Sequence, residues 1–177
     1  MKNSLFITIF FIFSIVNLFG QKPQTKVFQK FTTADSVILV SHLTTNIPIV
    51  DSMTKKWIGS VKLVDKNKPN YKIIRESISL KRNETDSILT ILLTENKDTI
   101  IEDIQCFIPH HGILIFKKGK CSYFDICFGC RHFITSKDIK LSDELSIKTW
   151  NDLERFFRNR NLNYEMPGNE PEIEDDN

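Results

Sequence analysis

Residues 106–130 read CFIPHHGILIFKKGKCSYFDICFGC, a stretch in which a short polar turn separates two apolar segments. The first apolar segment covers residues 112–116, and residues 117–120 carry three lysines and one glycine. Gly119 is the residue of this turn that adopts a positive φ at the least cost. The pattern therefore predicts an antiparallel β-hairpin.

The type of turn decides which residues of this hairpin face each other. Lys118 resists a positive φ, so a type I turn with Gly119 as the bulge residue is favoured over a two-residue type I′ turn. The favoured turn brings two pairs of residues opposite each other: His111 with Asp125, and Cys106 with Cys130. The alternative turn places His110 opposite Cys127. Pro109 cannot donate to a strand ladder and weakens the pairing beyond it.

Outside the hairpin, the sequence predicts further strands and two helices. Apolar, β-branched segments predict strands over residues 36–42, 60–64, 71–80 and 100–107, with a turn at residues 66–70. Asn83 has the character of an N-cap for a helix over residues 84–94. Thr149 and Asp152 have the spacing of a capping box, and a second helix follows with one apolar stripe formed by Trp150, Leu153, Phe156 and Phe157. These elements predict a single α+β domain over residues 35–165, with a small, mainly antiparallel sheet and two amphipathic helices.

The two ends of the chain differ from this domain. Lys2, the apolar run of residues 5–19 and the small residue Gly20 match the three regions of a secretory signal peptide over residues 1–20. Fifteen helical residues span about 22 Å, too short for the roughly 30 Å hydrocarbon core of a bilayer. We therefore expect cleavage near Gly20, a periplasmic or secreted protein, and a mature chain without an integral membrane segment. Residues 21–34 read as a lead-in, and residues 166–177 as an acidic, disordered tail.

The charge balance limits the classes of partner. The chain carries 24 basic and 22 acidic residues, a formal net charge of +2, and these charges are spread along the sequence. Such a chain lacks the long-range field that attracts nucleic acid or an anionic membrane. We therefore expect no nucleic-acid partner.

Cysteine and histidine are concentrated in one region. Seven of the eight such residues lie between residues 106 and 132: Cys106, His110, His111, Cys121, Cys127, Cys130 and His132. Thiols and imidazoles bind soft metals, form disulfides or act as nucleophiles. In an oxidising compartment, four cysteines are compatible with two disulfides in three possible pairings.

Three interpretations of this cluster remain open. In the first, disulfides stabilise the hairpin and His111 hydrogen-bonds Asp125. In the second, a structural, zinc-type site is formed by Cys106, His111, Cys127 and Cys130. In the third, Cys127 and Cys130 form a redox pair whose thiol pKa is lowered by Arg131 and His132. Cys121 lies just after the turn and is expected to stand apart from the set.

The same residues resemble a known group of proteins. The segments 106–112 (CFIPHHG) and 126–130 (ICFGC) are similar to a motif of exported bacterial proteins, many from Bacteroidetes, in which a cysteine precedes Pro-Arg-His or Pro-His-His and then Cys-Phe-x-Cys. The helix that begins near Trp150 extends the resemblance. It implies that Cys106, His111, Cys127 and Cys130 form a shared set. No activity is assigned to that group, so the resemblance implies no reaction.

These observations predict an exported globular protein whose Cys/His cluster is structural, held by a disulfide or zinc, with a binding or structural role. A periplasmic thiol-disulfide oxidoreductase that uses Cys127 and Cys130 is the alternative. No nucleophile elbow, His-Glu-x-x-His helix or phosphate-binding glycine loop is present in the sequence, so we name no catalytic residue and expect a non-enzymatic protein.

Overall fold

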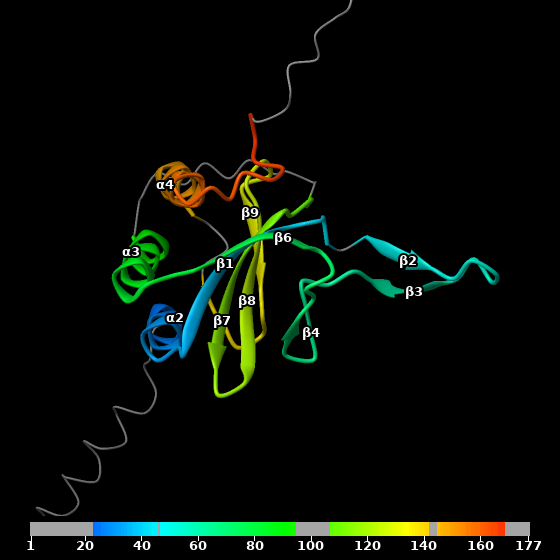
Figure 1. Ribbon diagram of the computed structural model, residues 1–177, viewed down its shortest axis with the longest axis horizontal. Coiled ribbons are helices and arrows are strands. Elements are labelled where there is room, and N and C mark those ends of the chain that lie inside the picture. Colours follow the sequence, from blue (N-terminus) through cyan, green and yellow to red (C-terminus); the bar gives the residue numbers. More distant parts are fainter. Residues whose placement is uncertain (1–22, 46, 95–106, 142–144, 169–177) are drawn as a thin grey trace, which may run out of the picture.

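A five-stranded antiparallel sheet is the centre of the computed structural model, which describes residues 23–45, 47–94, 107–141 and 145–168. The strand order is β6-β1-β7-β8-β9 (Figure 1). Its members are β1 (Ser36–His42), β6 (Ile74–Ser79), β7 (His111–Lys117), β8 (Lys120–Cys127) and β9 (His132–Thr135). β1 pairs with β6 and β7, and β8 pairs with β7 and β9. The two strands of the predicted hairpin thus lie in the middle of the sheet.

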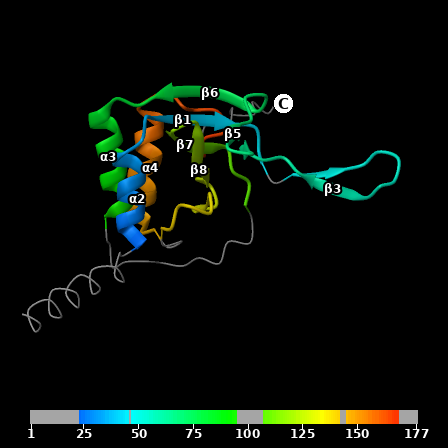
Figure 2. The same ribbon diagram turned by 90° about the horizontal axis from the view of Figure 1, so that it is seen from below.

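Three helices of the described residues cover one face of the sheet (Figures 1 and 2). They are α2 (Pro23–Thr32), α3 (Arg82–Leu93) and α4 (Ile147–Arg158). The main core lies between the helices and the sheet, because each strand turns every second side chain toward the helices. Its fully buried large side chains include Phe31 of α2, Ile88 of α3, Phe124 of β8 and Phe157 of α4.

The other face of the sheet packs against the chain between β1 and β6. This chain contains the short hairpin of β4 (Val64–Asp65) and β5 (Lys68–Pro69), and buries Leu63 and Ile73 against Val40 and Leu114. Gly112 permits this approach. A Cβ atom there would lie 2.7 Å from Leu63 Cδ2 and 3.0 Å from the backbone oxygen of Phe124. The glycine of the Pro-x-His-Gly segment therefore serves packing.

A second small sheet stands away from the body. β2 (Pro48–Val50) and β3 (Trp57–Ser60) pair with each other and form an arm that projects from the body in both views (Figures 1 and 2). No helix in the described residues is long and apolar enough to cross a membrane.

The α+β class and the mainly antiparallel sheet are confirmed, and the expected strand over residues 36–42 is β1. The sequence predicts no helix in the lead-in of residues 21–34, yet α2 forms there. Val27 and Phe31 of α2 are nevertheless completely buried in the core. Residues 1–22, 95–106 and 169–177 lie outside the described residues, so the expected signal peptide, most of the strand at 100–107 and residues 169–177 of the expected acidic tail fall there.

The N-caps of α3 and α4 each lie two or three residues before the predicted caps. The N-cap of α3 is Lys81 rather than Asn83, and the Glu84 carboxylate accepts from the Lys81 backbone N–H at 2.8 Å. The N-cap of α4 is Ser146 rather than Thr149. The Ser146 hydroxyl accepts from the Thr149 backbone N–H at 3.1 Å. Glu84 was expected in the first turn of α3 and lies there, whereas Thr149, expected as the N-cap of α4, is the third residue of that helix.

The predicted hairpin register is wrong by one residue. Lys117 pairs with Lys120 and Phe116 with Cys121, so the turn consists of Lys118 and Gly119 alone. Both have positive φ, 48° and 72°, as a type I′ turn requires. The Lys118 backbone N–H donates to Asp35 Oδ2 at 2.6 Å, a tertiary contact that supports this backbone.

Candidate functional site

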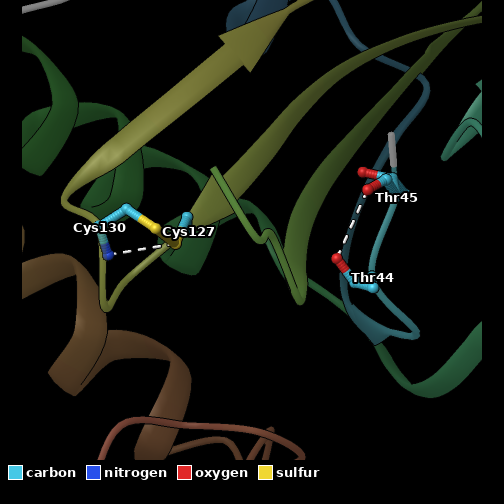
Figure 3. The surroundings of a disulfide bond; sticks show 4 residues. All are labelled: Thr44, Thr45, Cys127 and Cys130. Carbon is cyan, nitrogen blue, oxygen red and sulfur yellow. Dashed lines mark hydrogen bonds between the residues drawn. A yellow bond between two sulfur atoms is a disulfide. The ribbon is translucent and has the colours of Figure 1, made fainter. Parts of the chain in front are cut away.

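Cys127 and Cys130 form a disulfide at the end of β8. Cys127 is the last residue of the strand, and Cys130 lies in the turn that leads to β9, with 5.2 Å between the two Cα atoms. The backbone N–H of Cys130 donates to the Cys127 sulfur at 3.1 Å (Figure 3). Both residues are buried. The bond therefore closes a four-residue turn at the edge of the core.

The surroundings of this disulfide suit a structural cross-link. A redox-active pair lowers the pKa of its attacking thiol, most often at a helix N-terminus, and keeps it accessible. Here the pair follows a strand and precedes another strand. The aromatic ring of Phe128, inside the loop, packs on Trp150 and Phe157 in the core. The loop thus holds an aromatic anchor under α4.

His111 lies in an aromatic pocket and not beside Asp125. It pairs with Ile126 across the sheet, and its ring packs edge-on against Phe128 at 5.0 Å and Phe157 at 5.7 Å between centroids. Burial, together with the neighbouring His42 and His110, lowers the pKa of His111 to about 3. The ring is therefore neutral at ordinary pH, and the predicted His111–Asp125 hydrogen bond does not form.

Asp125 instead faces His42, which the sequence analysis did not single out. The His42 Nε2 and Asp125 Oδ1 atoms are 3.2 Å apart, and both residues are almost completely buried. The second carboxylate oxygen accepts from the Thr45 hydroxyl at 2.6 Å, and His42 Nδ1 lies 2.8 Å from the Leu43 carbonyl. Burial lowers the pKa of His42, but the contact with Asp125 outweighs it and the net shift is upward.

This buried pair is arranged for structure and not for acid–base catalysis. One imidazole nitrogen of His42 faces a carbonyl oxygen and the other a carboxylate, so neither is left to accept a proton from a substrate. The pair therefore ties β1 to β8 across Gly112, the residue without a side chain between them.

The proposed metal set is not assembled among its described members. Cys106 lies outside the described residues. Of the other three, Cys127 and Cys130 are joined to each other, and the His111 ring is surrounded by aromatic rings. Within the described part of the chain, no group of three or more Cys, His, Asp or Glu side chains is placed to hold a metal ion.

Cys121 is separate from these residues, as expected. It is a free thiol, buried in the smaller core on the other face of the sheet. Burial raises its pKa to about 11. The thiol is therefore protonated and unreactive at neutral pH.

A lysine-rich cavity beside Cys121 was missed by the sequence analysis. It has a volume of about 730 Å³ and lies between the β4–β5 hairpin, the β7–β8 turn and the chain after β9, with Lys30 of α2 at its edge. We call it the lysine pocket. Seven lysines line it: Lys30, Lys62, Lys66, Lys117, Lys118, Lys120 and Lys137. Only two carboxylates, those of Asp65 and Asp138, accompany them.

One of these carboxylates is already neutralised. Asp138 forms an ion pair with Lys30 and accepts from the hydroxyls of Ser122 and Ser136, each at 2.7 Å. Burial raises its pKa, but these hydrogen bonds outweigh burial and lower it to about 2. The Asp138 group is therefore a fixed, satisfied part of the wall, and Asp65 is the one other carboxylate of the lining beside the remaining lysines.

Five lysines of the pocket make no ion pair with any described residue. They are Lys62, Lys66, Lys118, Lys120 and Lys137, all exposed, and we call them the open lysines. Lys117 is different, because its ammonium group donates to the Thr33 hydroxyl at 2.7 Å. Several ammonium groups that share one cavity create a positive potential there, which is focused by the low-dielectric wall.

Two of the open lysines occupy backbone positions that disfavour lysine. Lys118 and Lys66 each stand first in a two-residue hairpin turn, with φ of 48° and 46°. Such positions favour glycine, asparagine or aspartate, because a Cβ atom makes the left-handed conformation costly. Strained conformations of this kind concentrate at functional sites. The two hairpin turns that line the pocket thus carry lysine at the same unusual backbone position.

The sequence contained a partial signal of this site. Lysines cluster at residues 66–68 and 117–120, but both clusters were interpreted as turns. The charges are spread along the sequence, and this spread conceals that the two turns line one pocket in the fold. No protein-family model matches this chain, and no characterised protein or solved structure is significantly similar to it.

Proposed function

We propose that this chain is an exported binding protein whose lysine pocket holds a small ligand with two or more phosphate or sulfate groups. The observation that carries this proposal is the set of five open lysines around one cavity of about 730 Å³. A single monovalent anion would leave most of these ammonium groups unneutralised. A ligand with several anionic groups can contact several of them at once.

The lining of the pocket favours such a ligand over nucleic acid. It contains one aromatic residue, Tyr123, and no arginine. Proteins that bind single-stranded nucleic acid use several aromatic or arginine side chains on which bases stack. Lysine supplies point charges, which suit the tetrahedral phosphate and sulfate groups. Asn67 adds a neutral hydrogen-bonding group, whereas the hydroxyls of Ser122 and Ser136 already donate to Asp138.

Export remains part of the proposal. It is supported by the signal-peptide pattern of residues 1–20 and by the Cys127–Cys130 disulfide, a bond that persists in oxidising compartments. Mass spectrometry of the mature protein tests it. Retention of Met1 would contradict cleavage near Gly20.

The binding proposal is tested by calorimetric titration with tripolyphosphate and with sucrose octasulfate, two probes that separate phosphate from sulfate preference. We expect binding at low ionic strength that weakens steeply as salt is added, because exposed charges are screened within about 10 Å at 0.1 M salt. The triple variant Lys62→Gln, Lys120→Gln, Lys137→Gln removes three open lysines that do not sit in the turns. We expect its affinity to fall by about tenfold or more, since each charge contact contributes up to ~1 kcal/mol.

A matched control removes the same charge elsewhere. Lys26, Lys72 and Lys148 are exposed and outside the pocket, and their replacement by glutamine should leave affinity nearly unchanged. Equal losses in both triple variants would show that only net charge matters. That result, or the absence of binding by the wild-type protein to either probe, would refute a specific anion site.

A further inference from the structure

The β2–β3 arm exposes an unusual amount of apolar surface. Met53 at its tip is 91% exposed, Trp57 is 69% exposed and Val50 is 52% exposed. Val50 and Trp57 are cross-strand partners, so their side chains share one face of the arm. A two-stranded hairpin is marginally stable alone, and apolar side chains gathered on a protrusion mark a surface that another phase or molecule covers.

The tip of the arm is held in a defined shape by Asp51. Its Oδ1 atom accepts from the backbone N–H groups of Met53 at 3.1 Å and Thr54 at 2.6 Å, and from the Thr54 hydroxyl at 2.7 Å. Its backbone also exchanges hydrogen bonds with Lys55 and Lys56, each at 2.9 Å. The tip therefore presents Met53 outward without a large loss of conformational freedom when it binds.

Positive charge exceeds negative charge at the tip of the arm. Residues 47–61 contain two lysines, Lys55 and Lys56, directly beside the exposed Trp57, and a single acid, Asp51. Hydrogen bonds from the Thr54 backbone and hydroxyl lower the pKa of Asp51, and its carboxylate is engaged by the turn. The outer part of the arm thus combines an apolar point with an adjoining pair of ammonium groups.

We propose that the β2–β3 arm docks on an anionic lipid surface, with Met53, Val50 and Trp57 in the interfacial region and Lys55 and Lys56 on lipid phosphates. Tryptophan prefers this boundary because one end of its ring is apolar and the other donates a hydrogen bond. Lysines beside an apolar tip are attracted to anionic headgroups. A protein partner would be expected to contact a broader face than this narrow, convex tip.

Vesicle binding of the full mature chain tests the docking. The chain has two tryptophans, and Trp150 is buried in the core, so a change of fluorescence on binding reports mainly Trp57. We expect the emission to move to shorter wavelength with vesicles of phosphatidylcholine and phosphatidylglycerol at 3:1, and to change much less with phosphatidylcholine alone. Sedimentation with the same vesicles measures the partition coefficient independently of tryptophan.

Three variants locate the contact. Met53→Ser should lower the partition coefficient by about tenfold, because it removes the most exposed apolar side chain. Lys55→Gln with Lys56→Gln should reduce the preference for anionic over neutral vesicles by roughly tenfold. Phe28→Ser is the matched control, since Phe28 is a half-exposed aromatic residue on α2 in the body, and it should partition like the wild type.

Several outcomes would overturn the proposal. Absence of wild-type partitioning into either vesicle would exclude lipid, and the apolar tip would then mark a protein partner. Equal losses in the Met53 and Phe28 variants would show that the arm has no special role. If the Lys62, Lys120, Lys137 triple variant, in which the arm is intact, does not bind vesicles at all, the lysine pocket and not the arm is the lipid-binding site.

Discussion

His42 and His111 lie on neighbouring strands and meet opposite surroundings. His111 is opposite Ser41 in the β1–β7 ladder, so the adjacent His42 points to the other face of the sheet. Asp125 raises the pKa of His42, whereas burial among aromatic rings lowers that of His111 to about 3. Two imidazoles beside one hairpin thus differ: His42 contacts a buried carboxylate and His111 is a neutral core residue, and the difference depends on long-range neighbours.

These two shifts affect stability in opposite directions. The raised pKa of His42 contributes stability that is present below pH ~6.5 and is lost as the pH rises through the folded-state value. For His111 the unfolded chain binds a proton near pH ~6.5 and the folded chain does not until about 3. Stability that involves His111 is therefore lost as the pH falls below about 6.5.

We predict that His111→Leu flattens the acid side of the stability profile. Between pH 6.5 and 4.5 the wild type should lose about 2 kcal/mol of unfolding free energy through His111, since a pKa difference of one unit corresponds to about 1.4 kcal/mol. Over the same pH range, the loss of unfolding free energy in the variant should be smaller than in the wild type by about 2 kcal/mol. Urea unfolding at a series of pH values measures it. His132→Gln, at a half-exposed histidine outside this pocket, is the control, and a variant profile as steep as that of the wild type would contradict the burial of a neutral His111.

At the scale of elements, the β7–β8 turn shows why the register was predicted incorrectly. Local propensity disfavours a positive φ at lysine, and the prediction followed propensity. The structure contains the type I′ turn because its twist matches the flanking strands and because Asp35 accepts from the Lys118 backbone. Asp35 is 83 residues away in the chain, so nothing near Lys118 in the sequence indicates its contribution.

We predict that Lys118→Asn stabilises the protein while weakening anion binding. Asparagine followed by glycine is the preferred type I′ pair, so the change should raise the unfolding free energy by ~0.5–1 kcal/mol. The same change removes one open lysine from the pocket. Thermal unfolding at 1 M salt, where the repulsion between the lysines is screened, and calorimetry at low salt measure the two effects. Lys120→Asn, which places asparagine in strand β8, should weaken binding without the gain; a similar gain at both positions would contradict strain at Lys118.

Other elements were predictable to the extent that their signals are local. The strand at residues 36–42 and the aromatic stripe of α4 follow periodicity, and both were found where expected. Helix α2 was missed because its packing on α3 and the sheet, and not its weak local pattern, makes it part of the core. The candidate site was missed for a similar reason, since its two lysine turns are joined only by the tertiary fold.

For the whole molecule, a formal charge of +2 hides an uneven distribution. Seven lysines and two carboxylates line the lysine pocket, so the rest of the molecule carries a net negative charge in compensation. Most α4 charges, in contrast, form ion pairs along the helix, such as Arg158 with Glu154 at 2.8 Å. Acidic and basic side chains therefore pair along α4, whereas lysines outnumber carboxylates in the lysine pocket.

We predict that the open lysines lower stability at low ionic strength. Their mutual repulsion opposes folding, which brings the two lysine turns together, and is screened by salt. The Lys62, Lys120, Lys137 triple variant should therefore exceed the wild type by ~1 kcal/mol in unfolding free energy at 10 mM salt, a gain that disappears at 1 M salt. Urea unfolding at both salt concentrations measures it.

The Lys26, Lys72, Lys148 triple variant supplies the comparison, because it removes the same charge from outside the pocket. It should show no gain at low salt, and it loses only one exposed ion pair, between Lys148 and Asp152, which contributes little. Tripolyphosphate should raise the stability of the wild type more than that of the pocket variant, since a ligand that binds only the folded state stabilises it. If the pocket variant is less stable than the wild type at 10 mM salt, the lysines do not repel one another, and their charges must be neutralised within the folded chain.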